Sequence, residues 1–294
     1  MPRWLERAKG RLRDFAHADT RQRPRIGLAL GGGFARGAAH LGVLRVLEQN
    51  KIPIDCIAGT SAGAMIGVSY ASGRSTEQIE RQSAASRFRD FGQWKLSKMG
   101  LATNDRIDSY LRHYLGVTSF AELKFPMTIA ATDLETGDAV YFREGPLGPP
   151  LRASCAYPGM FCPVEYQGRM LVDGFLAAAV PVAAAQEMGA DVVIAVFLDS
   201  DSGQRPNGVV DILSRSFAIL QKHADLEWRS AASVIIAPNV RQIAWDEFEK
   251  TPLLVEAGEK AANAALPKIR GAIEIASKVK RGRQSPNRMG PIRE

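Results

Sequence analysis

Hydrophobic positions follow two alternating spacings along the chain from about residue 25. Residues 25–30 form a short apolar run that ends at three glycines, and residues 39–47 carry apolar side chains at the spacing of one helix face. Residues 54–58 form a second apolar run, and the small residues of 61–71 predict a second helix. Strand, helix, strand, helix in this order predicts a parallel sheet with right-handed crossovers.

Later apolar runs predict further strands at residues 127–131, 139–142, 170–172 and 191–198. The last run is almost continuously apolar, as expected of a strand that is buried on both faces. Helical spacing returns over residues 209–232 and 251–279. We therefore expect an α/β fold.

The composition is that of an ordinary globular protein. Of the 294 residues, 46% are hydrophobic and 23% are charged, with 27 Gly and 16 Pro. These values exclude a collagen-like, disordered or disulfide-stapled chain, and the length fits one large α/β domain. Cys56, Cys155 and Cys162 are an odd number without metal-type clustering, so we expect reduced thiols, no metal site and a cytoplasmic location.

No segment of the sequence predicts a membrane span. The longest apolar run covers about 11 residues, 175–185, and Pro181 interrupts it, whereas a spanning helix needs roughly 20. The N-terminus also lacks the apolar stretch of a secretory signal.

The net charge of +7 is concentrated at the two ends of the chain. Residues 1–25 carry eight basic and three acidic side chains, and residues 268–294 carry eight basic and two acidic ones. Residues 26–267 have a net charge of −4. Because a nucleic-acid enzyme more often carries a basic stripe across its folded body, this distribution argues against a nucleic-acid partner.

Residues 59–63, Gly-Thr-Ser-Ala-Gly, form a G-x-S-x-G sequence between a predicted strand and a predicted helix. A serine on such a tight turn needs neighbours without bulky side chains, which Gly59 and Gly63 provide. The start of the helix favours negative charge that develops near the hydroxyl group. The pattern alone is common by chance, but this context makes Ser61 a candidate nucleophile.

A second glycine cluster, residues 31–37, also separates a strand from a helix. It does not fit a dinucleotide fingerprint, because Phe34 stands where the second glycine is required, and the lysine of a phosphate loop is absent. No cofactor is therefore predicted. The remaining functional interpretation is an oxyanion hole made by consecutive backbone N–H groups, with Arg36 as a fixed positive charge or a brace. The structural alternative is a tight turn with Arg36 in a surface ion pair.

An activated serine needs a base, and two candidates remain open. Asp173 follows a short apolar run and precedes Gly174, so its carboxylate could take a proton from Ser61 directly or simply cap its own turn. His223 would complete the chain order of an α/β-hydrolase triad, although a histidine on a polar helix face more often has no catalytic role. The remaining histidines are not favoured by position: His17, His40 and His113.

Five blocks of the sequence together resemble the patatin-like phospholipase family, in its bacterial branch. They lie at residues 28–44, 59–63, 132–137, 153–163 and 171–174. The resemblance implies a three-layer α/β/α sandwich around a mainly parallel central sheet and a serine acyl-ester hydrolase that acts on lipids. It also implies a dyad without histidine, with Ser61 as the nucleophile and Asp173 as the base, and an oxyanion hole from the glycine-rich loop.

Two residues depart from the family pattern. Phe34 stands where many members have another glycine, although the amides around Gly32, Gly33 and Phe34 can still form the hole. Phe175 follows Asp173-Gly174 where Gly or Ala is usual, and it could narrow the site or shift the carboxylate. This second departure keeps open a non-catalytic regulatory or scaffold protein with the same fold.

The first segment is expected to contact anionic membrane surfaces. Apolar residues recur there at helical spacing among basic ones: Trp4, Ala8, Leu12 and Phe15. A helix docked on the protein body and a disordered arm are the alternatives. We thus expect a basic amphipathic segment at 1–24, a hydrolase domain at 25–280 and a basic disordered tail at 281–294. A bulky segment at 86–101 is interpreted as a lid, an acyl-binding wall or ordinary helix packing.

Overall fold

The computed structural model describes residues 23–199, 205, 206, 208–224 and 226–284. Eight strands of this described part form one sheet. Their bounds are Ile26–Leu30 (β1), Cys56–Thr60 (β2), Met127–Asp133 (β5), Ala139–Phe142 (β6), Val164–Tyr166 (β7), Arg169–Asp173 (β8), Val192–Val196 (β9) and Val234–Ile236 (β10). The strands lie in the order β10-β9-β1-β2-β5-β8-β7, with β6 paired to β5.

The sheet is mainly parallel, as the sequence predicts, but it has an antiparallel edge. Strands β10, β9, β1, β2 and β5 run parallel to one another. The strand predicted at 170–172 is the centre of β8, which lies antiparallel between β5 and β7. Asp173 is the last residue of β8 and is paired with Ala131 of β5.

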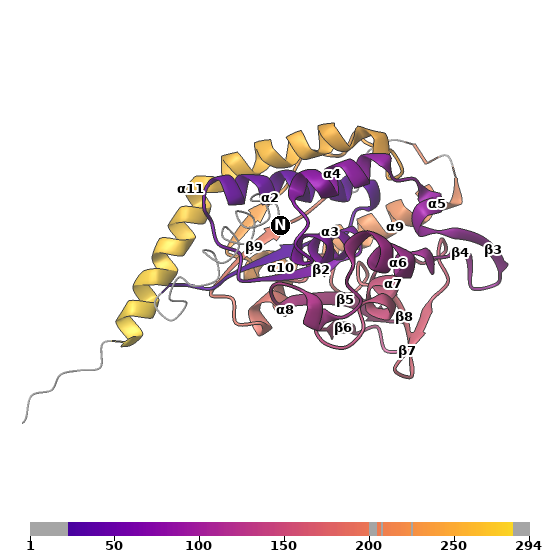
Figure 1. The fold of residues 1–294 in the computed structure, drawn as a ribbon, viewed down its shortest axis with the longest axis horizontal. Helices are drawn as coiled ribbons and strands as arrows, with labels where there is room; N and C mark the ends of the chain where they lie inside the picture. Colours follow the sequence, from indigo (N-terminus) through magenta and orange to yellow (C-terminus); the bar gives the residue numbers. More distant parts are fainter. Residues whose placement is uncertain (1–22, 200–204, 207, 225, 285–294) are drawn as a thin grey trace, which may run out of the picture.

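Helices cover both faces of the sheet, which confirms the expected three-layer α/β/α sandwich (Figure 1). One layer contains α2 (Ala39–Gln49), α3 (Ala62–Ala71), α4 (Thr76–Ala85) and α11 (Thr251–Gln284), and the other contains α8 (Val182–Glu187) and α10 (Leu226–Ala231). Side chains of β1 alternate between the two layers. Ile26, Leu28 and Leu30 pack in the core beneath α2 and α11, while Ala29 packs with residues of α8.

Helix α2 lies directly against α11 because two glycines face the partner helix. A Cβ atom added to Gly42 would lie 2.0 Å from the carbonyl oxygen of Val255. One added to Gly258 would lie 2.0 Å from the carbonyl oxygen of Ala39. This close contact holds the start of α2 in place, and α2 follows the glycine-rich loop.

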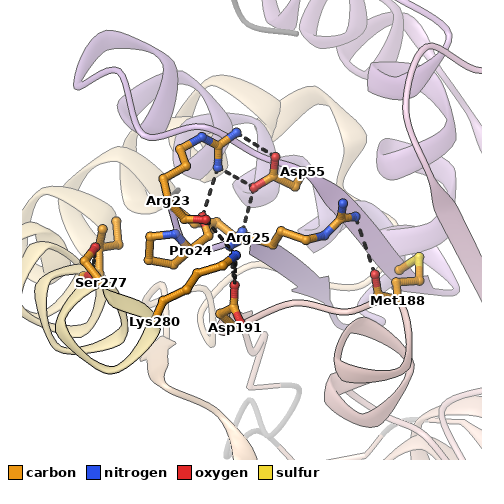
Figure 2. A network of polar contacts seen from close by, with 10 residues as sticks. Arg23, Pro24, Arg25, Asp55, Met188, Asp191, Ser277 and Lys280 are labelled. Carbon is orange, nitrogen blue, oxygen red and sulfur yellow. Dashed lines mark hydrogen bonds and ion pairs between the residues drawn. The ribbon is translucent and has the colours of Figure 1, made fainter. Parts of the chain in front are cut away.

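Polar contacts tie the first described residues to the amino-terminal ends of the strands (Figure 2). Arg23 donates two hydrogen bonds of 2.7 Å to Asp55, which precedes β2. Asp191, which precedes β9, accepts a hydrogen bond of 2.7 Å from the Arg25 amide. Lys280 of α11 donates to the carbonyl oxygen of Arg23 at 2.9 Å. The beginning of the described chain and the far part of α11 therefore lie side by side.

One expected boundary is wrong. Helix α11 continues to Gln284, so residues 281–284 are helical and the ordered domain does not end at 280. The helical pattern predicted over 209–232 is occupied by α9 (Val209–Ala224) and α10, on either side of residue 225, which lies outside the described residues.

The predicted amphipathic segment lies outside the described residues except for Arg23 and Pro24, and so do residues 285–294. In the part of the chain that is described, no helix is both long and apolar enough to span a bilayer.

Candidate active site

Ser61 lies on a tight turn between β2 and α3. Its backbone has φ 54° and ψ −122°, in a region that residues with a Cβ atom rarely adopt. A Cβ atom added to Gly63 would lie 2.2 Å from the carbonyl oxygen of Leu30, and one added to Gly59 would lie 2.6 Å from the Cα atom of Ala64. Close backbone packing therefore requires both glycines, and the turn has the strand–turn–helix context that the sequence predicts.

The structure brings Ser61 and Asp173 together. The Ser61 hydroxyl donates to Oδ2 of Asp173 at 2.7 Å, and the Phe175 amide donates to Oδ1 at 2.9 Å. Both side chains are buried. A Cβ atom added to Gly174 would lie 2.5 Å from the carbonyl oxygen of Ala130, so the chain can leave β8 this closely only through a glycine.

Burial raises the pKa of Asp173 to about 7, although the hydrogen bonds from Phe175 and Ser61 oppose this shift. A carboxyl group with this pKa is divided between its charged and neutral forms at neutral pH. It can therefore accept a proton from Ser61 and return it under the same conditions. A hydroxyl group in hydrogen-bond contact with a carboxylate is an arrangement that can activate the hydroxyl for attack.

The glycine-rich loop passes beside Ser61. A Cβ atom added to Gly32 would lie 3.3 Å from the Ser61 Cβ atom. Within the described residues, the amides of Gly33 and Phe34 have no carbonyl partner, whereas the Gly32 amide donates to the carbonyl oxygen of Ala179 at 3.4 Å. Gly33 and Phe34 thus offer the N–H groups that an oxyanion hole needs.

Phe34 adopts the left-handed backbone conformation that favours glycine, with φ 52°. This geometry explains why a glycine is common at this position of the family pattern. The Phe34 ring packs edge-on between Tyr157 and Trp245, with centroid distances of 5.1 and 5.2 Å. The aromatic contacts offset the backbone strain.

Arg36 is buried below the loop, and its Nε atom donates to the carbonyl oxygen of Ile243 at 2.7 Å. This contact braces the loop against the segment that contains Ile243, which is one of the roles expected from the sequence. Burial lowers the pKa of Arg36, against the opposing charges of Asp199 and Glu247.

His40 holds the glycine-rich loop in place, a role that the sequence did not predict. It is fully buried on α2, where Nε2 lies 2.8 Å from the carbonyl oxygen of Gly31. Burial lowers the pKa of His40 to about 4, so the imidazole is neutral and Nε2–H donates to the loop.

Two further residues of the site lie at the end of α7 (Gly148–Ser154): Ser154 is its last residue, and Cys155 follows it. The hydroxyl oxygen of Ser154 accepts a hydrogen bond of 2.8 Å from the Ser61 amide and fixes the turn. Cys155 lines the cavity beside Ser61, and burial together with the charge of Asp173 raises the pKa of its thiol. Residues 153–163 are one of the blocks that resemble the family, but their amino-acid types do not predict the contacts of Ser154 and Cys155 with Ser61.

Two chambers meet at the site, and Phe34, Ser61 and Trp245 line both. The first, here called the polar chamber, has a volume of about 460 Å³. Besides Asp173, its charged lining residues are Arg36, Arg205, Arg215, Arg241, Asp211 and Asp246. Arg241 is in an ion pair with Asp199.

The second, here called the apolar chamber, has a volume of about 120 Å³ and lies between α3, α4 and the segment 86–101. Its lining includes Met65, Ile66, Phe88, Phe91, Ile107 and Phe161. Phe88 and Phe91 bring the bulky segment 86–101 into the lining of this chamber.

The remaining candidates occupy different places. His223 belongs to α9, but its side chain lies outside the described part, and Asp173 contacts Ser61 directly. Phe175 lines the polar chamber and leaves the carboxylate against Ser61. Among the side chains that the structure describes, no group of His, Cys, Asp or Glu is arranged to hold a metal ion.

A buried serine on a strand–helix turn, in hydrogen-bond contact with a carboxylate and beside open amides, has the geometry that serine hydrolases use. The family model described as patatin-like phospholipase matches residues 28–185. The chain belongs to this family of lipid hydrolases.

Relatives of the chain include mycobacterial and fungal proteins. An NTE family protein of Mycobacterium tuberculosis (strain ATCC 25618 / H37Rv) is 37% identical over 202 residues, which are 65% of this chain and 55% of the relative. A lysophospholipase of Emericella nidulans is 29% identical over 226 residues, which are 74% of this chain and 14% of the relative. The chain thus spans about half the length of its mycobacterial relatives and a small part of the fungal one.

Solved structures that the chain matches include human GIVD cytosolic phospholipase A2, with a TM-score of 0.48 and 12% identity over 92% of this chain and 63% of that chain. VipD from Legionella pneumophila has a TM-score of 0.47 and 12% identity over 83% of this chain and 67% of that chain.

Proposed function

We propose that the protein hydrolyses acyl esters of lipids, with Ser61 as the nucleophile and Asp173 as its general base. The observation that carries this proposal is the 2.7 Å hydrogen bond from the Ser61 hydroxyl to a buried carboxylate at the junction of two chambers. The fungal relative named a lysophospholipase supports the same reaction class.

The chemistry follows from this contact. Asp173 takes the hydroxyl proton while Ser61 Oγ attacks the ester carbonyl carbon. The oxyanion forms beside the amides of Gly33 and Phe34, near the positive end of α3. Asp173 returns the proton to the leaving alcohol, which leaves an acyl-enzyme. A water molecule then gives its proton to Asp173 and releases the fatty acid, and Ser61 recovers its proton.

The two chambers suggest how a lipid lies across the site. The apolar chamber accepts the beginning of an acyl chain, because aliphatic and aromatic side chains line it. The polar chamber accepts the remainder of the lipid, and its arginines favour a head group that carries phosphate. We therefore propose phospholipids or lysophospholipids as substrates in preference to triacylglycerols.

A fluorophosphonate probe and a soluble nitrophenyl ester test the reaction. Wild-type protein should be labelled and should hydrolyse the ester, whereas Ser61→Ala should not be labelled and should lose activity about 10³-fold or more. Labelling of both proteins would remove Ser61 from the mechanism. An unlabelled, inactive wild type with intact circular dichroism would favour the non-catalytic scaffold.

The head-group preference is tested with a second variant. Arg205 is an exposed cation that lines the polar chamber. Arg205→Gln should raise KM several-fold for a lysophospholipid and leave KM for a monoacylglycerol unchanged. An equal effect on both substrates would contradict the phosphate preference.

A further inference from the structure

A separate two-stranded hairpin stands beside the apolar chamber. Its strands, β3 (Gln93–Ser97) and β4 (Gly100–Thr103), form a two-stranded sheet of their own, which a single bridge joins to Phe161 through Ala102. The hairpin projects from one end of the molecule (Figure 1). Three large apolar side chains are at least half exposed on it: Trp94 (69%), Met99 (53%) and Leu101 (50%). Exposed apolar side chains gathered on one element indicate a contact surface.

The hairpin is basic, although the body of the protein is acidic. Lys95 and Lys98 are exposed among the three apolar side chains. The whole segment 86–101 carries four basic residues against one acidic residue, Asp90, while residues 26–267 have a net charge of −4. Tryptophan, aliphatic side chains and lysines on one projecting element are typical of contact with an anionic lipid surface.

An aromatic path joins this surface to the apolar chamber. The Trp94 ring lies 5.1 Å from the ring of Phe88, and Phe88 stacks on Phe161 at 5.6 Å. Phe88 and Phe161 both line the chamber that contains Ser61. The path thus runs from a tryptophan that is 69% exposed to a phenylalanine that is 5% exposed.

The hairpin is held firmly against the chamber wall. The amides of Leu101 and Ala102 donate to the carbonyl oxygen of Met160 at 3.1 and 2.9 Å, and the Cys162 amide donates to Ala102 at 2.9 Å. A Cβ atom added to Gly100 would lie 2.6 Å from the amide nitrogen of Cys162. The exposed side chains are therefore presented at a fixed distance from the site.

We propose that this hairpin is the element that inserts into an anionic lipid surface. Trp94, Met99 and Leu101 enter the boundary between head groups and acyl chains, and Lys95 and Lys98 contact lipid phosphates. An acyl chain that leaves the bilayer passes along Phe88 and Phe161 into the apolar chamber. This role rests on the proposed lipid substrate, but insertion itself requires no turnover.

A second copy of the chain is the less suitable occupant. A symmetric dimer built on this face brings the same residues of both copies together, so the lysines of two hairpins would repel one another. A lipid surface with negative charge instead complements them.

The deciding test is quenching of Trp94 by lipids. Full-length protein with Ser61→Ala, which cannot hydrolyse the vesicles, and with Trp4→Phe is mixed with vesicles of phosphatidylglycerol and phosphatidylcholine whose acyl chains carry bromine. Insertion predicts strong quenching, most of which is lost when Trp94→Phe is added; the quenching that remains comes from Trp245, which lines the apolar chamber. The proposal is overturned if quenching is unchanged after Trp94→Phe, or if the protein with Trp94 intact shows no quenching. Either result holds even if other segments bind the vesicles.

Sedimentation with the same vesicles measures the contribution to binding. Replacing Trp94, Met99 and Leu101 by alanine should lower the partition coefficient about tenfold or more. The matched control replaces three exposed apolar residues of α11, Leu253, Ile275 and Val279, by alanine and should stay within about twofold.

Equal losses in the two triple variants contradict a specific role for the hairpin. If the protein forms dimers in solution and only the hairpin variant abolishes them, the hairpin surface binds a second copy of the chain instead of lipid. Hydrolysis of a soluble ester by the protein with Ser61 intact reports on the proposed function separately, so failure of either idea is recognised by itself.

Discussion

The carboxyl group of Asp173 receives hydrogen bonds from the Ser61 hydroxyl and the Phe175 amide, and protein encloses the rest of it. Enclosure keeps water away from the reacting proton, and it also disfavours the charged form that must accept this proton. The pKa of about 7 is the result of these opposing effects. The base is therefore expected to limit activity on the acid side of neutrality.

The first prediction concerns pH. For a soluble ester, kcat/KM should rise about tenfold per pH unit below 7 and level off above it, because only ionised Asp173 accepts the Ser61 proton. The measurement is a pH series from 5 to about 9 with an ester whose spontaneous hydrolysis is subtracted. A profile that is flat between 5 and 7 contradicts Asp173 as the base.

The second prediction separates activity from stability. Asp173→Asn should lower activity about 10²-fold or more, because the amide cannot accept the proton. The same variant should be more stable than wild type at pH 8, by on the order of 1 kcal/mol or about 2–4 °C in Tm.

The sign of the stability change follows from linkage. Between the ordinary aspartate pKa of 3.8 and about 7, the folded protein keeps a proton that the unfolded chain has released. The contribution of this carboxyl group to stability therefore falls as pH rises through this window, and asparagine escapes the loss. Thermal unfolding at pH 5 and pH 8 measures the difference.

His223→Ala is the control for the choice of base. It should remain within a few-fold of wild type on the soluble ester. A collapse of its activity with an intact circular dichroism spectrum would favour the Ser–Asp–His triad.

At the scale of elements, the two glycine motifs and their flanking strands and helices could be predicted because each signal is local. The strand, the glycines and the helix start lie within a few residues of one another around Gly32 and Ser61. Strong periodicity on both sides then gives the order β1, α2, β2, α3 without knowledge of the rest of the chain.

The contact between Ser61 and Asp173 could not be derived from the pattern in the same way. The two residues are 112 positions apart, and they meet because β8 pairs with β5, which pairs with β2. The resemblance named the pair, whereas periodicity alone left His223 open. Trp245 and Ser154 have no local signal, since their roles depend on segments that fold back from elsewhere.

The third prediction concerns the crossing of α2 and α11. Gly42→Ala places a methyl group into the backbone of α11 and should destabilise the fold by about 2–3 kcal/mol, which is roughly 5–10 °C in Tm. Gly271→Ala on α11 is the matched control, because no atom lies within 4 Å of the added Cβ atom. This control should stabilise the protein by about 0.5–1 kcal/mol. Equal Tm values for the two variants would show that the helices separate easily.

At the scale of the whole molecule, the hairpin β3–β4 and the end of α11 lie at opposite ends of the long axis (Figure 1). Lys280 of α11 lies beside Arg23, so the first described residues and the last turns of α11 meet at one place (Figure 2). The mildly acidic body separates this place from the basic hairpin.

The fourth prediction concerns the first segment. Residues 1–25 carry a net charge of +5, and each basic residue near an anionic surface contributes up to about 1 kcal/mol. Removing residues 1–20 should reduce sedimentation with acidic vesicles and leave hydrolysis of a soluble ester nearly unchanged.

Salt provides the control for this prediction. Binding through the first segment should weaken as salt rises, because screening shortens the electrostatic range to roughly 8 Å at physiological ionic strength. If the truncated and full-length proteins sediment equally at low salt, the segment is not the anchor.

The contact between Lys280 and Arg23 also means that the order of the elements along the chain can be changed by circular permutation. Gln284, the last helical residue, is one turn or about 6 Å of helix beyond Lys280, so a short glycine-serine linker can join it to Arg23. New ends can then be opened at Gly137, in the exposed turn between β5 and β6, where an added Cβ atom meets nothing within 4 Å. We expect such a circular permutant to fold and to keep its esterase activity, with both new ends on the antiparallel side of the sheet.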